Sequence, residues 1–439
     1  MAGPGRLSRR ALLRGALVTG TASLLGGCTG FATSGTSGLT FLSTQFTPLD
    51  EAERFRALLR KAFDGDVGYV TSDPGPFVTQ VRSQVEAGAV RASVIGGLHG
   101  DLAPLAPSHL EDLTDIVSDF SSLGWPPEYL ELARAGTNRT WYVPWAQASY
   151  VLAAHVDALA HLPPGADAED LTYDQLLDWA IAARRANGNR PALGLPGGPK
   201  GLLHRFFQGY LLPSFTGGQV TTFRSPEAVT AWEYMRELWR NCAPASTNYA
   251  QMQEPMEAGE VTMGWDHVAR LVNVPRREPD KWRMMPAPRG PKGRGYMAVL
   301  TGLAIPKGAP DQDRARRLIA ALSKAETQVD LLRANAFFPT VRTSIPDDLP
   351  AAIRMEAGAV ARQRESKAAL LSLPPVGLGS REGELSKVFR DCFETIVLKG
   401  GNARSTVDAQ ARVINQLLAD AKVACWAPDP RGTGICEVR

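Results

Sequence analysis

The chain has 439 residues and a nearly balanced charge, with 48 Lys and Arg side chains against 45 Asp and Glu side chains. A chain of this length is too long to bury its apolar residues in one core, so two domains are expected. The formal net charge of +3 is too small to favour a nucleic-acid partner, because such binding requires a concentrated positive surface.

Residues 7–28, LSRRALLRGALVTGTASLLGGC, begin with arginines and continue with an uncharged stretch, 15–27, that ends at a cysteine. This stretch is shorter than the roughly 20 apolar residues of a membrane-spanning helix, and with its charged start it is typical of a secretory signal. The first part, SRRALL, resembles a twin-arginine export signal, which is an address read by a receptor. The last part, LGGC, resembles the lipobox of bacterial lipoproteins, in which the thiol receives a diacylglycerol. A buried amphipathic helix with an incidental cysteine is the alternative, which the glycines and the unpaired arginines disfavour.

We therefore expect residues 1–27 to be a signal peptide, Cys28 to carry lipid, and residues 28–37 to be a flexible tether. The mature protein would then be exported and anchored by lipid to the outer face of the cytoplasmic membrane. Residues 1–27 contain four arginines and no acid, so their removal leaves 44 basic against 45 acidic side chains. No later run of about 18 apolar residues occurs, which predicts a soluble body after the anchor.

Four cysteines follow the tether: Cys242, Cys392, Cys425 and Cys436. An even number of cysteines in an exported protein predicts two disulfides, and four cysteines allow three pairings. The pair Cys425 with Cys436 is preferred, because it closes a short loop that contains proline and glycine.

Strand and helix patterns alternate at the start of the body, with strands predicted over 39–42, 67–70 and 92–98 and helices over 50–63 and 77–85. This alternation predicts parallel strands with helices on both faces of the sheet. In such sheets, ligands bind beyond the carboxyl ends of the strands. Gln45, His99 and Asp101 follow two of these strand ends, so we expect them beside a cleft.

An aromatic-rich strand is predicted from residue 138 up to a turn at Pro144, and a second extended segment covers 150–152. Two strands without a helix between them indicate that the chain passes here from one domain to the other. Thr172 has the chemistry of a helix N-cap, with Gln175 three residues later. The remaining predicted elements are a helix over 172–186, a Gly/Pro-rich loop over 194–201, and helices over 226–240 and 311–333.

Three segments together carry a resemblance to a known family: Asn138–Pro144, Met256–Met263 and Thr301–Lys307. Their order and spacing, with the lipobox, resemble the extracellular solute-binding lipoproteins of carbohydrate ABC importers, of the maltose-binding-protein type. The first segment is similar to the crossover into the second lobe of that family, and the third is similar to its return crossover. Ala154–His155, where the family usually has Tyr-Asn, departs from the pattern, as do Met256 and Thr262.

The resemblance implies an α/β fold of two lobes, each a mixed sheet flanked by helices, that closes on a ligand like a clamshell. By matched positions, lobe one comprises 38–146 plus 297–348, and lobe two comprises 147–296 plus 349–439. The implied function is high-affinity capture of a carbohydrate (a mono-, di- or amino sugar) and its delivery to an ABC permease. The resemblance further implies a non-catalytic monomer that uses no cofactor, metal or nucleic acid.

Other function classes stay open. One is a binder of a glycerophosphodiester or another non-sugar solute, in which Lys200, Arg205 and Arg381 could hold an anion. A less favoured class is a lipid-anchored glycoside hydrolase. The chain has no HExxH, GxSxG or Walker-type motif and no histidine pair at metal-ligand spacing, but the sequence does not tell whether two carboxylates face each other. An adhesion or scaffold lipoprotein without a small ligand is the least favoured class.

Sugar recognition requires an aromatic ring against the apolar face of the sugar and polar side chains at its hydroxyls. Trp145, after Pro144, and Trp265, after a turn predicted at Gly264, are the candidate aromatics, with burial in the core as their alternative. For Asp266 and the adjacent His267, a solvated pair is the alternative. The candidate ligand contacts are Gln45, His99, Asp101, Trp145, Gln147, His204, Trp265, Asp266, Tyr296 and Arg381, of which Tyr296 and Arg381 depend on family position alone.

Overall fold

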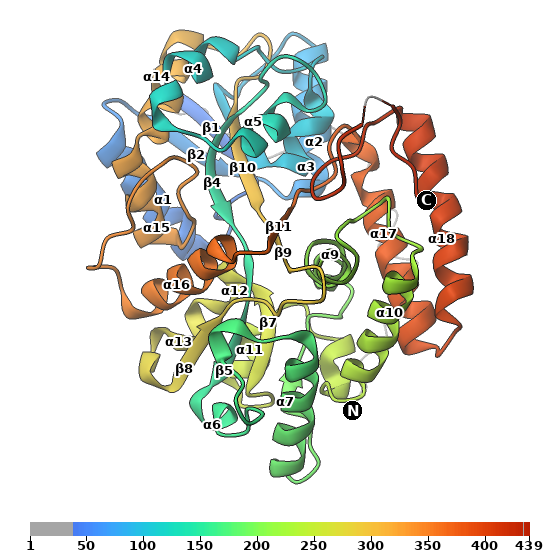
Figure 1. Ribbon diagram of the computed structural model, residues 1–439. Helices are drawn as coiled ribbons and strands as arrows, with labels where there is room; N and C mark the ends of the chain where they lie inside the picture. Colours follow the sequence, from blue (N-terminus) through green and yellow to red (C-terminus); the bar gives the residue numbers. More distant parts are fainter. Residues whose placement is uncertain (1–37, 433) are drawn as a thin grey trace, which may run out of the picture. The chain divides into compact units, whose positions relative to one another are not determined.

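The computed structural model describes residues 38–432 and 434–439. The predicted signal peptide, Cys28 and the tether at 28–37 lie outside the described residues and stay predictions. Residues 38–439 are built around two main sheets (Figure 1), and none of the helices in the described ranges is long and apolar enough to cross a membrane.

The first main sheet has five strands in the order β2-β1-β3-β10-β4, with β1 at Leu39–Ser43, β2 at Val67–Thr71, β3 at Val94–Leu98, β4 at Val143–Ala148 and β10 at Val299–Ala304. β1 pairs in parallel with β2 and β3, whereas β10 runs antiparallel to β3 and β4. The first three predicted strands and the helices between them, α1 (Leu49–Ala62) and α2 (Pro74–Glu86), are confirmed. The sheet is mixed rather than parallel throughout, because β10 returns to it from a distant part of the chain. We call the part around this sheet lobe one.

The second main sheet has four strands in the order β6-β7-β5-β8, with β5 at Tyr150–His155, β6 at Leu193–Gly194, β7 at Met263–His267 and β8 at Trp282–Met285. β5 lies in the middle and runs antiparallel to both β7 and β8. A small parallel pair joins β9 (Arg294–Met297) to β11 (Ala369–Ser372). We call the part around the four-stranded sheet lobe two.

The chain passes from lobe one to lobe two at Ser149, which alone separates β4 from β5. Its hydroxyl donates to the carbonyl of Met297 (3.0 Å) and accepts from the Gln363 amide (3.2 Å), so it ties together three segments that lie far apart in sequence. The turn predicted at Pro144 is wrong. Pro144 lies inside β4 opposite Gly302, where the pairing with β10 shifts register, and a strand tolerates proline at such an irregularity.

Local capping explains the predicted helix over 172–186. The hydroxyl of Thr172 accepts from the Gln175 backbone N–H (3.1 Å), and the Gln175 side chain accepts in return from the Thr172 N–H (2.9 Å).

The helix predicted over 311–333 is two helices, because Lys324 has an extended backbone and starts a second helix. The helices beyond α2 are α3 His99–Leu102, α4 Thr114–Asp119, α5 Pro127–Arg134, α6 Val156–Leu159, α7 Tyr173–Ala186, α8 Leu203–Phe206, α9 Leu212–Thr216, α10 Pro226–Trp239, α11 Gln253–Glu257, α12 Val268–Leu271, α13 Asn273–Arg276, α14 Gln312–Ser323, α15 Ala325–Asn335, α16 Ala351–Glu365, α17 Glu382–Cys392 and α18 Ala403–Ala421.

Helices cover both sheets (Figure 1). In lobe one, α1 packs against α15, and α5 and α14 pack against β4. In lobe two, α16 packs on β8 and β5, while α18 packs on both α17 and α10. The core of lobe one includes an aromatic cluster in which Phe41 and Tyr69 each meet Phe55 edge-on, at centroid distances of 5.8 and 4.7 Å. Such offset contacts add to the stability gained by burial.

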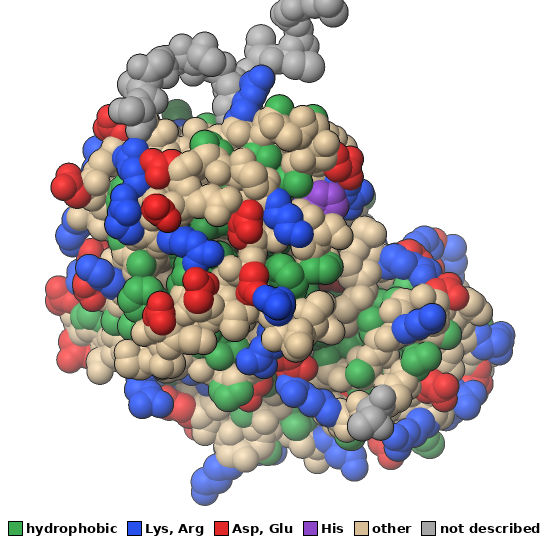
Figure 2. All heavy atoms as spheres, turned by 90° about the horizontal axis from the view of Figure 1, so that it is seen from above, with side chains coloured by type: hydrophobic (Ala, Val, Ile, Leu, Met, Phe, Trp, Pro, Cys, Tyr) green, Lys and Arg blue, Asp and Glu red, His purple; other side chains and the backbone are tan. Residues whose placement is uncertain are grey.

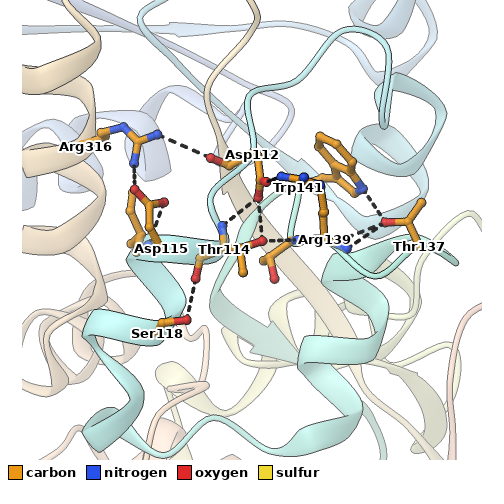
Figure 3. Close-up of polar contacts among 10 residues, drawn as sticks. Asp112, Thr114, Asp115, Ser118, Thr137, Arg139, Trp141 and Arg316 are labelled. Carbon is orange, nitrogen blue, oxygen red and sulfur yellow. Dashed lines mark hydrogen bonds and ion pairs between the residues drawn. The ribbon is translucent and has the colours of Figure 1, made fainter.

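Figure 3 shows how polar contacts fix one end of lobe one. Asp112 accepts from the backbone N–H of Thr114 (3.0 Å) and pairs with Arg139, so it joins the start of α4 to the segment before β4. Arg316 of α14 donates to Asp115 (2.7 Å) in the first turn of α4. These exposed pairs contribute little energy individually, but they fix the register between the three segments.

The surface carries both signs of charge. Figure 2 shows the structure from above, turned by 90° about the horizontal axis from the view of Figure 1. Acidic and basic side chains are interspersed over that face, with hydrophobic side chains scattered among them. This distribution agrees with the nearly balanced composition.

Cys425 and Cys436 form a disulfide, as preferred. Cys242 and Cys392 are buried and unpaired, so the expectation of a second disulfide is wrong. Both thiols pack as small apolar side chains in the core of lobe two, where burial raises their pKa.

Candidate functional site

A pocket with a volume of about 600 Å³ opens where the carboxyl ends of β1, β3 and β7 meet the start of β5. Lobe one contributes Gln45 after β1 and the 98–101 turn after β3. Lobe two contributes Tyr150 at the start of β5 and His267 at the end of β7. Further lining residues come from α8, α12 and α17, including His204, Arg205, Arg270, Glu382 and Arg390. The rule that ligands bind beyond strand ends thus locates the pocket correctly in lobe one.

The loop ends in lobe one are held by hydrogen bonds of Asp101. Its carboxylate accepts from the Leu98 N–H (3.0 Å) and from the Thr44 hydroxyl (2.7 Å), and the Gln45 amide donates to that same hydroxyl (3.0 Å). Burial raises the pKa of Asp101, although these hydrogen bonds act in the opposite direction. Asp101 therefore connects the ends of β1 and β3 and presents Gln45 at the pocket wall.

His99 lines the pocket but has no free ring nitrogen. Its Nε2 lies 3.1 Å from the carbonyl of Pro375, so Nε2 carries the proton, and Nδ1 accepts from the Tyr142 hydroxyl at 2.8 Å. Burial lowers the pKa of His99, so the imidazole is neutral. With both nitrogens occupied, His99 offers a ligand only the carbon atoms of its ring.

The charged part of the wall is an ion pair from lobe two. Arg205 Nη2 lies 2.9 Å from Glu382 Oε1, and Arg205 Nη1 donates to the Gln208 amide oxygen at 3.1 Å. Burial opposes the charge of Arg205, but Glu382 outweighs it and keeps the pKa of Arg205 above its ordinary value. The neighbouring His204 is buried with an unpartnered Nδ1, and burial together with the charges of Arg205 and Arg390 lowers its pKa to about 2. His204 is therefore neutral.

Tyr150 is an aromatic residue of the pocket wall, although it is almost fully buried, with 2% exposed. Its ring stacks on Trp265, with 4.7 Å between centroids and an interplanar angle of 8°, and meets the His267 ring edge-on at 5.2 Å. Its backbone N–H donates to Tyr210, but its hydroxyl makes no hydrogen bond among the described residues. Burial raises the pKa of Tyr150 to about 12, so this hydroxyl stays protonated.

A second cavity of about 500 Å³ shares Gln45, His267, Arg270 and Phe337 with the first. Its other walls include the amide side chains of Gln251, Gln253 and Asn273. We call these two adjoining cavities the cleft; Asp50 and Glu51 line the second cavity beside the amides. A cleft of this size and lining suits a small polar molecule.

Residues 48–329 match the family model described as bacterial extracellular solute-binding protein. The chain belongs to the bacterial extracellular solute-binding proteins. This match confirms the family resemblance stated from the crossover segments.

Three solved structures illustrate the fold. The GacH receptor of Streptomyces glaucescens, solved unliganded and in complex with acarbose, is 18% identical with a TM-score of 0.69, over 87% of this chain and 98% of that one. Maltose-bound MalE3 of T. maritima is 22% identical with a TM-score of 0.69, over 87% and 99%. UgpB of Mycobacterium tuberculosis, in complex with glycerophosphocholine, is 17% identical with a TM-score of 0.68, over 88% and 99%. These likenesses confirm the expected two-lobed α/β fold. No curated protein matches the sequence.

In this solute-binding protein, the pocket brings together four of the ten candidate contacts, namely Gln45, His99, Asp101 and His204. Their contact with a ligand stays a prediction. Tyr150, Arg205 and Glu382 are further pocket residues that the candidate set missed, although Arg205 appeared as a possible anion ligand. Tyr150 begins β5, so a rule about the carboxyl ends of strands gave no signal for it. The sequence carries no signal for Glu382, because it lies 177 residues from Arg205.

The two candidate tryptophans lie in the core, so the expectation that they face a cleft is wrong. Trp145 is 1% exposed in lobe one, between Phe46 and Phe55. Trp265 is 0% exposed and lies behind Tyr150, with its other side against Phe206. Each residue sits within a strand rather than after a turn: Gly264, where a turn was predicted, belongs to β7.

Gln147 and Asp266 hold the framework of the solute-binding protein. The Gln147 amide donates to the Pro339 carbonyl (2.8 Å) and accepts from the Tyr129 hydroxyl, which connects β4 to the segment after α15. Asp266 accepts from the backbone N–H groups of Met252 (2.8 Å) and His267 (2.7 Å). Asp266 is fully buried and burial raises its pKa to about 6, so the alternative of a solvated pair with His267 is wrong too.

Tyr296 and Arg381 do not line the pocket. Tyr296 lines a separate cavity of about 660 Å³, together with Tyr129 and Arg364. Arg381 pairs on the surface with Glu384 (2.8 Å) and Asp420 (3.4 Å). The family positions used for these two residues therefore did not transfer to this chain. Within the described part of the chain, no group of three or more His, Cys, Asp or Glu side chains could hold a metal ion.

Proposed function

We propose that the protein captures a carbohydrate outside the membrane and delivers it to an ABC permease. Lobe one would comprise 38–146 plus 297–348 and lobe two 147–296 plus 349–439, and both lobes would close on the ligand. The observation that carries the proposal is the side chain of Tyr150 in the pocket wall beside Arg205 and Glu382: its ring stacks on Trp265, and its hydroxyl makes no hydrogen bond to the described residues. An aromatic face beside a paired donor and acceptor suits a ring that carries hydroxyl groups.

The structural relatives support this ligand class, since GacH was solved with acarbose and MalE3 with maltose. A second candidate is a glycerophosphodiester, because UgpB was solved with glycerophosphocholine and the cleft contains three arginines, Arg205, Arg270 and Arg390. The carbohydrate is favoured because the best buried of these arginines, Arg205, is already paired with a carboxylate.

A screen for ligand-induced thermal stabilisation tests the proposal. The purified protein is heated with monosaccharides, disaccharides, amino sugars and glycerophosphodiesters, and hits are titrated by calorimetry. A ligand at 100 times its Kd stabilises the fold by about 2.7 kcal/mol. Stabilisation by a sugar that is reduced in Tyr150→Phe but kept in Arg381→Gln, a surface variant, supports the carbohydrate site. Stabilisation by a glycerophosphodiester alone contradicts it and favours the second candidate.

The protein is proposed to release its ligand unchanged. The family is one of solute-binding proteins, and neither the sequence motifs nor the pocket supply a nucleophile with its base. Incubation with the tightest-binding glycan, followed by mass spectrometry, should recover only intact glycan. A cleaved product would favour the hydrolase alternative, with Asp101 and Glu382 as the first carboxylates to replace.

We further propose that Cys28 carries the lipid that holds the protein at the outer face of the cytoplasmic membrane. The support is the LGGC segment after a short uncharged stretch. A Cys28→Ser variant should move from the membrane fraction to the soluble fraction. Replacement of Arg9 and Arg10 by lysine should block export if the twin-arginine route is used. Retention of the serine variant in the membrane fraction would contradict the anchor.

A further inference from the structure

The Arg205–Glu382 pair lies in the wall of the pocket rather than on the surface. The side chains of Arg205 and Glu382 are only 20% and 13% exposed, and their nearest atoms are 2.9 Å apart. At this burial, solvent screens the two charges poorly, so each charge dominates the potential felt by a ligand beside it. The sign of charge that the pocket accepts therefore depends on whether Arg205 is neutralised.

The other charged groups at the pocket leave little uncompensated positive charge inside it. Arg270 donates to the Ala250 carbonyl (2.9 Å) and lies 4.0 Å from the fully buried carboxylate of Asp266. Arg390 is exposed, so water and salt screen its charge. Asp101 adds a carboxylate to the wall. The imidazoles add no charge, because burial lowers the pKa of His99, His204 and His267.

The Glu382 carboxylate is also confined from the side of lobe one. Its Oε2 lies so close to the backbone of Gly100 that a Cβ at this position would approach it to 2.5 Å. Gly100 belongs to α3 of lobe one, whereas Glu382 and Arg205 belong to lobe two. With Arg205 on one side and α3 on the other, the carboxylate has no room to move away from a ligand while the lobes hold this arrangement.

We propose that Glu382 selects the charge of the ligand, so that the pocket admits an uncharged polyhydroxylated molecule and rejects an anion. This inference rests on the proposed carbohydrate function and narrows it. A hydroxyl group can donate to the Glu382 carboxylate and accept from the Arg205 guanidinium, whereas a phosphate or carboxylate oxygen meets repulsion from Glu382 and competes with it for Arg205. Without Glu382, the same arginine becomes a buried anion site.

Sulfate serves as the probe, because it does not depend on knowing the natural ligand. Its binding is measured by calorimetry at constant ionic strength for the parent protein, Glu382→Gln and the matched control Glu384→Gln. Glu384 lies in the same first turn of α17 but pairs with Arg381 on the surface, so the control makes the same change in net charge away from the pocket. Sulfate should bind Glu382→Gln roughly ten- to hundredfold more tightly than it binds the parent or the control.

Adding Arg205→Met to Glu382→Gln should abolish the gain, which places the new site at Arg205. Circular dichroism checks the fold of each variant, and Glu382→Ser replaces Glu382→Gln should the amide disturb packing. Equal sulfate affinity in parent, Glu382→Gln and Glu384→Gln would overturn the inference, and so would a gain that survives Arg205→Met.

A second measurement separates this inference from the proposed function. The parent protein is tested against glucose and glucuronate, and against the glycan hits of the thermal screen. If a sugar binds but sulfate has the same affinity for the parent, Glu382→Gln and Glu384→Gln, only the charge selection is overturned. If sulfate binds Glu382→Gln more tightly than the parent but no sugar binds, the carbohydrate function is overturned and the selection against anions stands.

Discussion

The ring of Tyr150 lies flat on the indole of Trp265, with their centroids 4.7 Å apart and only 8° between their planes. Tyr150 lines the pocket, whereas Trp265 is fully buried behind it. Trp265 therefore fixes the position of the Tyr150 ring without itself reaching the pocket.

Trp265→Ala and Trp145→Ala form a matched pair that tests this role. Both indoles are buried, and neither indole N–H has a hydrogen-bond partner in the described chain. Each change should cost about 3–5 kcal/mol of unfolding free energy, measured in urea. Among the molecules that remain folded, only those of Trp265→Ala should also bind the ligand more weakly, because Trp145 lies in the core of lobe one. Full affinity in Trp265→Ala would show that Tyr150 does not depend on this support.

Tyr150→Phe should weaken ligand binding without loss of stability. The hydroxyl makes no hydrogen bond within the described residues, so its removal breaks no internal contact, and the ring remains on Trp265. A lost hydrogen bond to the ligand costs about 0.5–1.5 kcal/mol, or roughly two- to tenfold in Kd. Calorimetry gives the affinity and thermal melting gives the stability. A fall in Tm with unchanged affinity would remove the hydroxyl from the site.

Glu356 should make the protein less stable as the pH rises. Both of its carboxylate oxygens are buried without a partner, and burial raises its pKa well above the ordinary value of 4.5, although Arg276 acts in the opposite direction. The folded state therefore binds the proton more tightly than the unfolded state. The stabilisation from this group is complete below pH 4.5 and is lost as the pH rises through the folded-state pKa.

Glu356→Gln should accordingly gain stability over the parent as the pH increases from 5 to 8, by about 1–3 kcal/mol. Urea unfolding at several pH values measures this difference. Glu365→Gln, at the exposed end of the same helix, is the control and should show no such trend. A difference that stays constant across this pH range would mean that the Glu356 carboxyl does not titrate there.

The stability of the C-terminal segment should depend more on the hydrogen bonds of Asp429 than on the Cys425–Cys436 disulfide. The Asp429 carboxylate accepts from the backbone N–H groups of Gln219 (2.8 Å), Val220 (2.9 Å) and Thr221 (2.8 Å). Asp429→Ala leaves these buried donors unpaired, at about 1–3 kcal/mol each. The Cys425–Cys436 bridge spans 11 residues, and such a short loop contributes about 3 kcal/mol or less. In urea, Asp429→Ala should have a lower free energy of unfolding than the variant in which Cys425 and Cys436 are both replaced by serine. The reverse order would contradict this prediction.

Local patterns in the sequence predicted the framework of both lobes. The alternation of strands and helices located the first three strands, and the capping residues Thr172 and Gln175 located the start of α7. The strand-end rule brought Gln45, His99 and Asp101 to the pocket. Each of these inferences depends on residues close together in the chain, where steric and hydrogen-bonding preferences act directly.

The residues and elements whose predicted positions were wrong or missing are positioned by contacts between distant segments. All six residues of β4 are buried, so the usual alternation of inward and outward side chains gave no hint that Trp145 belongs to the core. The break between α14 and α15 occurs at Lys324, without the glycine or proline that normally marks a helix end. The pairing of Arg205 with Glu382 joins α8 to α17, and only the packing of lobe two brings them together.

The position of β10 in the first main sheet has a consequence for synthesis of the protein. β10 lies between β3 and β4, although it is translated some 150 residues after β4. A growing chain that ends before residue 299 therefore has two strands with unpaired edges where the fifth strand belongs. Such edges invite pairing with other chains, so the nascent polypeptide needs shielding, by a chaperone or by rapid synthesis, until β10 has emerged from the ribosome.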